Sequence, residues 1–134
     1  MSGFVDGYRP GRLIERHFEV PRTAEAVPAA RDMVRKFVSE HVRESTCDDV
    51  TLIVSELVTN AVRHGSGEAI DIALSVDGVV KVDVRDEGGD IVPAIRHQAD
   101  DGRPGGWGLV LVDRIAQEWG VVTDGCTRVW CVLR

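Results

Sequence analysis

The sequence has no long hydrophobic run, no export signal and no paired cysteines. No apolar stretch approaches the roughly 20 residues that a helix needs to cross a bilayer. The N-terminus lacks the apolar core of a secretory signal, so we expect a cytoplasmic protein that does not contact membranes. Cys47, Cys126 and Cys131 do not have the CxxC spacing of a zinc site, which favours reduced thiols with structural roles.

Positive charge is also scarce. The formal net charge is −6, whereas proteins that bind nucleic acid by neutralising phosphates usually have a basic face. An arginine cluster near the start is more typical of a solvated surface or a protein contact. It consists of Arg9, Arg12, Arg16 and Arg22. Nucleic acid is therefore not the expected partner.

The composition is ordinary for one globular domain. With 134 residues, 43% of them hydrophobic and 28% charged, the chain is long enough to bury a core of its own. Residues 1–12 form a glycine- and proline-containing segment that we expect to be a flexible tail. We predict a single domain over residues 1–134.

Two helices are expected in the first half of the chain, after a strand at residues 13–20. Proline is tolerated in a first helical turn, so the first helix should run over about residues 28–41, starting at the proline. Ser45 or Thr46 can cap a second helix, which should end near Gly65. The apolar residues of this second helix form one stripe that should face a sheet. They are Val50, Ile53, Val54, Leu57, Val58 and Ala61.

Alternating apolar and polar residues in the second half predict strands. Residues 70–76 and 80–84 alternate in this way, and the intervening Asp77-Gly78 is a strong hairpin signal. A second hairpin should turn at Asp124-Gly125 and close with the sequence TRVWCVL. The sequence therefore predicts an α+β domain.

A long irregular segment separates the two hairpins. Residues 87–106 show no periodicity and contain many glycines, a length and composition typical of a functional lid. A third helix should follow at about residues 107–119 and be stopped by Gly120. Trp107 lies where this segment meets the helix, whereas Trp119 and Trp130 are expected to be packed or half-buried.

Polar residues recur at every fourth position of the second predicted helix. Glu56, Asn60 and His64 lie along one line on the flank of the apolar stripe. A carboxylate and a carboxamide one turn apart suit Mg-phosphate chemistry, with the amide oxygen as a Mg²⁺ ligand and the carboxylate activating a nucleophile. Taken alone, the pattern more often marks the surface of an amphipathic helix.

Two glycine-containing segments also suggest nucleotide chemistry. Asp86 stands at the end of the strand predicted at residues 80–84. Its carboxylate can accept a hydrogen bond from the amino group of a base, and the glycines after it leave room for the ring. The sequence is equally that of a turn. Gly106 and Gly108 open the third helix, where backbone N–H groups can approach phosphate oxygens. A flexible linker is the alternative there.

The order of these elements resembles the N, G1 and G2 boxes of the GHKL ATPases. Within that superfamily, ELVTNAVRHG, VRDEGG, GGWGL and the closing VW are similar to the short, stand-alone anti-sigma-factor serine kinases of actinomycetes. The resemblance extends from about Arg16 to the C-terminus. It implies the Bergerat fold, a two-layer α+β sandwich with three helices on one face of a mixed, mainly antiparallel sheet.

The resemblance also implies roles for individual residues. Glu56 is the implied catalytic base, Asn60 the Mg²⁺ ligand and Asp86 the acceptor for the adenine amino group. His64 falls within the motif, although a capping or packing role is an equal alternative. The implied nucleotide-binding set is Asn60, His64, Asp86, Gly88, Gly106, Trp107, Gly108, Leu109 and Thr127.

Two positions depart from the family pattern. Asp90 replaces the second glycine of Asp-x-Gly-x-Gly. Arg128 occupies the place of the threonine that often precedes the closing Val-Trp, and Thr127 lies one residue earlier. These departures favour, to a small extent, a regulator that acts by binding alone.

The resemblance implies ATP and Mg²⁺ as cofactors and a homodimer as the assembly. The implied function is phosphorylation of a serine in a STAS-type anti-sigma-factor antagonist, combined with sequestration of a sigma factor. The alternative from another class is a non-catalytic regulator whose partner surface is set by ATP or by no ligand. The catalytic domain of a histidine kinase is less favoured, because no helical segment with a phosphoacceptor histidine is apparent.

Overall fold

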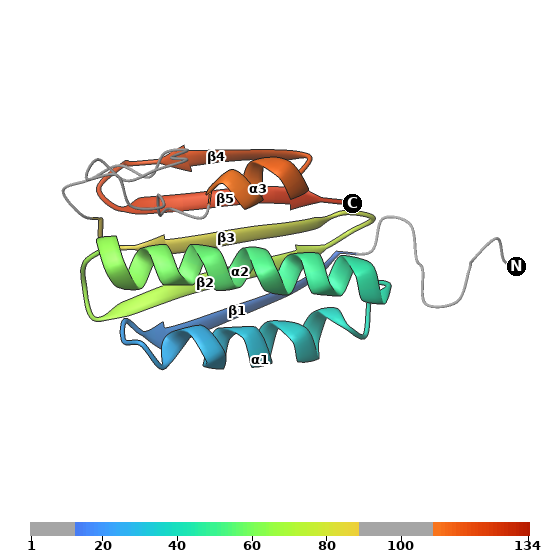
Figure 1. The fold of residues 1–134 in the computed structure, drawn as a ribbon, viewed down its shortest axis with the longest axis horizontal. Helices are drawn as coiled ribbons and strands as arrows, with labels where there is room; N and C mark the ends of the chain where they lie inside the picture. Colours follow the sequence, from blue (N-terminus) through green and yellow to red (C-terminus); the bar gives the residue numbers. More distant parts are fainter. Residues whose placement is uncertain (1–12, 89–108) are drawn as a thin grey trace, which may run out of the picture.

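The computed structural model describes residues 13–88 and 109–134 (Figure 1). In chain order the elements are β1 (Ile14–Pro21), α1 (Ala26–Val38), α2 (Glu44–His64), β2 (Ala69–Val76), β3 (Val80–Asp86), α3 (Leu109–Ile115), β4 (Glu118–Val122) and β5 (Thr127–Leu133). The predicted N-terminal tail and most of the predicted lid, from residue 89, lie outside the described residues.

The strands form one sheet in the order β1-β2-β3-β5-β4. The helices cover one face of it, which confirms the predicted two-layer α+β sandwich (Figure 1). All four pairings between the described strands are antiparallel, so no mixed portion is found in this part of the chain. Both predicted hairpin turns are present, with Gly78 and Gly125 at positive φ, a conformation that glycine adopts without steric cost.

The core lies between α2 and the inner face of the sheet. The predicted apolar stripe of α2 is confirmed, because all of its members are buried. On the sheet side, every second residue of the central strands is buried, as the alternation of side chains in a strand requires. These residues include Ile70, Ile72, Leu74, Val80, Val82, Val84, Val129, Cys131 and Leu133. Burial raises the pKa of the Cys131 thiol to about 12, so this thiol remains protonated at neutral pH.

The predicted ends of the first two helices need correction. α1 begins two residues before Pro28, which still lies in the first turn, and the helix ends three residues before His41. α2 begins at Glu44, and its N-cap residue Arg43 makes no side-chain capping hydrogen bond. The predicted cap by Ser45 or Thr46 is therefore wrong, since both residues already lie inside the helix.

The third helix is shorter than predicted. α3 ends at Ile115, and Trp119 and Gly120 belong to the edge strand β4 rather than to a helix terminus. Gly120 pairs with Trp130 on β5, and a Cβ atom at residue 120 would lie 2.8 Å from the indole ring. The glycine is thus required by the packing of an aromatic ring across the strand, which local helix-stop rules do not foresee.

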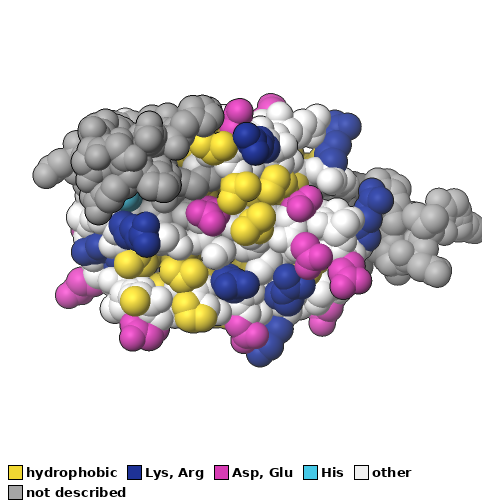
Figure 2. Space-filling view, in the orientation of Figure 1, with side chains coloured by type: hydrophobic (Ala, Val, Ile, Leu, Met, Phe, Trp, Pro, Cys, Tyr) yellow, Lys and Arg dark blue, Asp and Glu magenta, His cyan; other side chains and the backbone are white. Residues whose placement is uncertain are grey.

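The helix-bearing face carries charges of both signs. Figure 2 shows acidic and basic side chains interspersed over this face, with hydrophobic side chains near α3 and near the start of α1. Leu52 on α2 is one of the exposed large hydrophobic residues. Among the described residues no helix is long and apolar enough to span a membrane.

Candidate functional site

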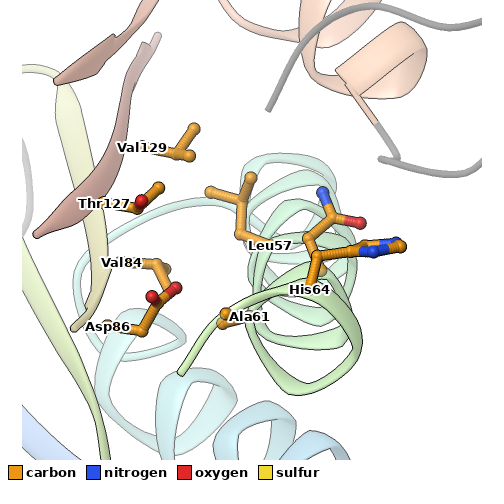
Figure 3. Close-up of a pocket in the computed structure, with 9 residues that line it drawn as sticks. Leu57, Ala61, His64, Val84, Asp86, Thr127 and Val129 are labelled. Carbon is orange, nitrogen blue, oxygen red and sulfur yellow. The ribbon is translucent and has the colours of Figure 1, made fainter. Parts of the chain in front are cut away.

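Two polar residues face inward at one end of the sheet. Asp86 on β3 and Thr127 on β5 are partners in the strand register, and each is 8% exposed. They continue the inward-facing rows of Val84 and Val129, so their side chains point toward the last turn of α2 (Figure 3). Alternation along each strand therefore replaces an apolar pair by a polar pair where the core ends.

A small pocket separates this polar pair from α2. Its volume is about 20 Å³, room for about one water molecule. Figure 3 shows Asp86, Thr127, Val84 and Val129 on one side and Leu57, Ala61 and His64 on the other. The lining residues in the described part of the chain are Leu57, Asn60, Ala61, His64, Gly65, Val84, Asp86, Thr127 and Val129.

Asn60 contributes a buried carboxamide to the pocket. The residue is 7% exposed, and its Nδ2 atom has no hydrogen-bond partner among residues 13–88 and 109–134. A buried donor without a partner costs about 1–3 kcal/mol, so this position is suited to a polar ligand that supplies an acceptor. The carboxamide also offers an oxygen of the kind that Mg²⁺ accepts as a ligand. Asn60 thus fits the cofactors that the sequence implies.

Backbone N–H groups hold the Asp86 carboxylate. Its Oδ1 atom accepts hydrogen bonds from the amides of Gly88 at 2.6 Å and Ser66 at 3.4 Å. Its Oδ2 atom accepts none from the described residues, and Asp86 lines the pocket. A Cβ atom at Gly65 would lie 2.6 Å from Oδ2. The glycine after α2 therefore lets the helix end approach the carboxylate.

Thr127, one residue earlier than the family pattern places its threonine, lines the pocket. Thr127 faces inward, and its neighbour Arg128 faces the opposite side of the sheet, where Nε lies 3.2 Å from Asp83 Oδ2. Asp83 has a raised pKa, chiefly because burial disfavours its charged form. The position of Thr127 in the chain thus differs from the family pattern, but this threonine still lines the pocket.

The remaining predicted residues fall into three groups. Glu56 is half-buried one turn before Asn60 and does not line the pocket. Gly88 binds the Asp86 carboxylate through its amide, and Leu109 is buried at the start of α3. Gly106, Trp107 and Gly108 lie outside the described residues, as does Asp90.

Periodicity and motif spacing do not indicate a role for residues 65–67, the segment that follows α2. Ser66 contacts both Asp86 and Gly88, and Arg22 donates to the carbonyl of Gly67. Arg22 was expected to be solvated or to contact another protein, but it is half-buried and hydrogen-bonded within the chain. The small residues between the helix and β2 were the available signal, because short side chains permit close backbone approach.

The structure is an α+β domain in which a helix and the central strands converge on a pocket with polar groups. Residues 20–133 match the family model of the histidine kinase-like ATPase domain, and the chain belongs to this family. Membership of an ATPase family implies that the chain binds ATP.

Several solved chains are similar, and one of them shows a similar fold. It is the crystal structure of the RsbU and RsbW domains of Rv1364c from Mycobacterium tuberculosis, with 23% identity and a TM-score of 0.68. The similarity covers 90% of this chain but 32% of the solved chain, so this chain corresponds to about a third of its length. A search of curated proteins returns no match.

Proposed function

We propose that the chain is a Mg-ATP-dependent serine protein kinase of the anti-sigma type. It transfers phosphate to a serine of a STAS-type anti-sigma-factor antagonist, and it sequesters a sigma factor. The observation that carries the proposal is the convergence of Asn60 and Asp86 on one pocket in a chain of the histidine kinase-like ATPase family. The RsbW domain named in the similar solved structure supports the choice of partners.

Asp86 and Thr127 are the proposed base-recognition residues. The Oδ2 atom of Asp86 accepts a hydrogen bond from the amino group of adenine, while its Oδ1 atom keeps accepting hydrogen bonds from two backbone amides. The pocket of about 20 Å³ is smaller than a base, so a bound base needs more room than the pocket has in this structure. The hydrophobic Leu57 and Val129 provide apolar contacts for the ring.

Asn60 and Glu56 are assigned to the phosphate end. Asn60 would hold Mg²⁺ through its carboxamide oxygen, and the cation, when bound, neutralises charge on the phosphates. Glu56, one turn away and outside the pocket, accepts the proton of the attacking serine hydroxyl. The proposal assigns the glycines at 106 and 108 to the phosphate oxygens, on the family pattern alone.

A second candidate is a regulator that binds ATP without transferring phosphate. The position of Glu56 outside the pocket and the replacement of a motif glycine by Asp90 favour it. In both cases a protein is the expected partner, in agreement with the mixed charges and hydrophobic side chains in Figure 2. A homodimer and a cytoplasmic location remain part of the proposal.

The test is to mix the protein with Mg-ATP labelled at the γ-phosphate and with antagonist domains encoded in the same genome. Transfer of label to a serine of one domain is the expected result. ATP binding by calorimetry without transfer to any domain would favour the binding-only candidate. Absence of ATP binding would contradict both.

A further inference from the structure

The hydrogen-bond pattern changes abruptly where α2 ends. The amide of Gly65 still donates to the carbonyl of Ala61 at 3.0 Å, as in a regular helix. The next amide, that of Ser66, would donate to the carbonyl of Val62 if the helix continued. It donates instead to Oδ1 of Asp86. The Val62 carbonyl therefore needs another donor.

Arg22 supplies that donor. Its Nη1 atom lies 2.9 Å from the Val62 oxygen, and its Nε atom lies 2.8 Å from the Gly67 oxygen. Its backbone amide also donates to the carbonyl of Glu68 at 2.8 Å. A guanidinium with donors in a fixed fork is suited to bind two carbonyls at once. A positive charge is also favourable at the C-terminal end of a helix.

Ser66 connects this arrangement to the end of β3. Its hydroxyl contacts the carbonyl of Gly88, and its own carbonyl accepts a hydrogen bond from the Glu87 amide at 3.2 Å. Together with the Ser66 amide, these contacts hold the strand end that bears Asp86. The series of hydrogen bonds from Arg22 to Asp86 thus passes through one segment, residues 65–67.

We infer that Arg22 is a positioning residue that sets the selectivity of the pocket for a 6-amino purine by keeping the Ser66 amide on Asp86. Without the guanidinium, the Val62 carbonyl is best satisfied by the Ser66 amide, so the helix would extend and withdraw its donor from Asp86. Oδ1 would then lose one of its two bonds and the carboxylate would rotate more freely. The inference rests on the proposed role of Asp86 in adenine recognition.

The ligand pair that reports on this effect is ATP and inosine triphosphate. The two carry the same ribose and triphosphate, but inosine has a carbonyl where adenine has an amino group. An oriented carboxylate accepts a hydrogen bond from the amino group and repels the carbonyl oxygen. A freely rotating carboxylate discriminates less, so the ratio of the two dissociation constants measures its orientation.

The experiment measures both dissociation constants by calorimetry, with Mg²⁺ present, for wild type, Arg22→Ala, Arg22→Lys and Arg63→Gln. Arg63 is exposed in the last turn of α2 and serves as the matched loss of charge. We expect Arg22→Ala to reduce the selectivity ratio about tenfold, which corresponds to one hydrogen bond at about 1.4 kcal/mol. Arg22→Lys, which keeps the charge and reaches one carbonyl, should restore part of the ratio, and Arg63→Gln should leave it unchanged.

A purely structural role for Arg22 predicts a different outcome. The melting temperature would fall, and the affinities for both nucleotides would decrease by the same factor. That result would overturn the inference. Amide hydrogen exchange in the ligand-free protein provides an arm that does not depend on nucleotide binding. The Gly88 amide should exchange about tenfold faster in Arg22→Ala, because the Asp86 carboxylate that accepts from it rotates more freely, whereas amides in the middle of α2 should not change.

The two proposals fail in distinguishable ways. A wild-type protein that binds both nucleotides equally would contradict the role of Asp86 in base recognition, and the selectivity claim for Arg22 would fall with it. Unchanged exchange at Gly88 in Arg22→Ala would overturn the positioning role even if wild type prefers ATP.

Discussion

Asp86 and Asp83 belong to the same strand, but the alternation of β3 sends their carboxylates to opposite faces of the sheet. Asp86 borders the pocket and is held by two backbone amides, whereas Asp83 pairs with Arg128 on the other face. The two residues have the same chemistry and differ in location. They therefore form a matched pair for separating a binding role from a general effect of charge.

Asp86→Asn should weaken Mg-ATP binding by about 1.5–3 kcal/mol, because the adenine amino group loses a charged acceptor. Calorimetric titration of the variant against wild type measures the effect. Asp83→Asn is the control and should bind ATP with nearly the wild-type affinity. Equal affinities in all three proteins would exclude Asp86 from the nucleotide site.

Glu56→Ala should leave ATP binding nearly intact and abolish phosphoryl transfer. The reason is that Glu56 lies outside the pocket, and its proposed contact is with the acceptor serine. The control is Asp49→Ala, which removes an exposed carboxylate from the same helix. A Glu56→Ala protein that phosphorylates an antagonist at the wild-type rate would show that another group is the base.

The pair formed by Asp83 and Arg128 predicts a dependence of stability on pH. Burial raises the pKa of Asp83 above the ordinary value of 3.8, and the Arg128 charge opposes this rise. The folded protein thus binds this proton more tightly than the unfolded chain, so the contribution of Asp83 to stability falls as pH rises from 3.8 through the folded pKa.

Arg128→Ala should push that pKa higher and so destabilise the protein more at neutral pH than in acid. We expect a loss of about 0.2–1 kcal/mol at neutral pH, the range for a partly exposed pair. Denaturant unfolding at several pH values measures it. In an Asp83→Asn background the same change should cost the same at every pH; a persistent pH dependence there would assign it to another group.

At the scale of elements, the edge strand β4 pairs with β5 at a glycine, Gly120, that leaves room for the Trp130 ring. Gly120→Ala should destabilise the protein by about 1–3 kcal/mol, because the added methyl group overlaps the Trp130 ring and forces one of the two strands to shift. The free energy of unfolding in denaturant measures the loss. Gly125→Asn should cost less than Gly120→Ala, since in the described part of the chain nothing beyond its own neighbours lies within 4 Å of its Cβ position, and asparagine is one of the residues that adopt positive φ most readily.

These elements also show what the sequence could predict. Periodicity identified α2, the β2–β3 hairpin and β5, because each buries one face and leaves the other exposed. It failed at the end of α3, where pairing with β5 turns an apparent helix terminus into an edge strand. Contacts between distant segments decide such cases, and local propensity does not contain them.

The candidate site divides in the same way. Asn60 and Asp86 were chosen for their spacing and their chemical groups, and the structure brings them to one pocket. Arg22 was missed because its partners are backbone carbonyls 40 and 45 residues away. Every residue has a backbone carbonyl, so a side chain that binds one places no requirement on the residue type of its partner. A contact of this kind therefore produces no sequence motif.

At the scale of the whole molecule, the pocket joins the two layers of the sandwich. One wall is the last turns of α2 and the other is the ends of β3 and β5, so a ligand there contacts the helical layer and the sheet together. Separation of these layers is part of unfolding. A ligand that binds only when they are assembled must therefore stabilise the entire domain.

Saturating Mg-ATP should accordingly raise the melting temperature of the whole domain in one cooperative step. At a free concentration of about 100 times the dissociation constant, the stabilisation is about 2.7 kcal/mol. For a domain of this length that corresponds to a rise of about 10 °C. Calorimetric or circular-dichroism melting curves measure it, with Mg²⁺ alone as the control. Asp86→Asn should reduce the rise at the same ATP concentration, because less of the folded protein is bound. If ATP raised the melting temperature of Asp86→Asn as much as that of wild type, the stabilising site would lie elsewhere on the molecule.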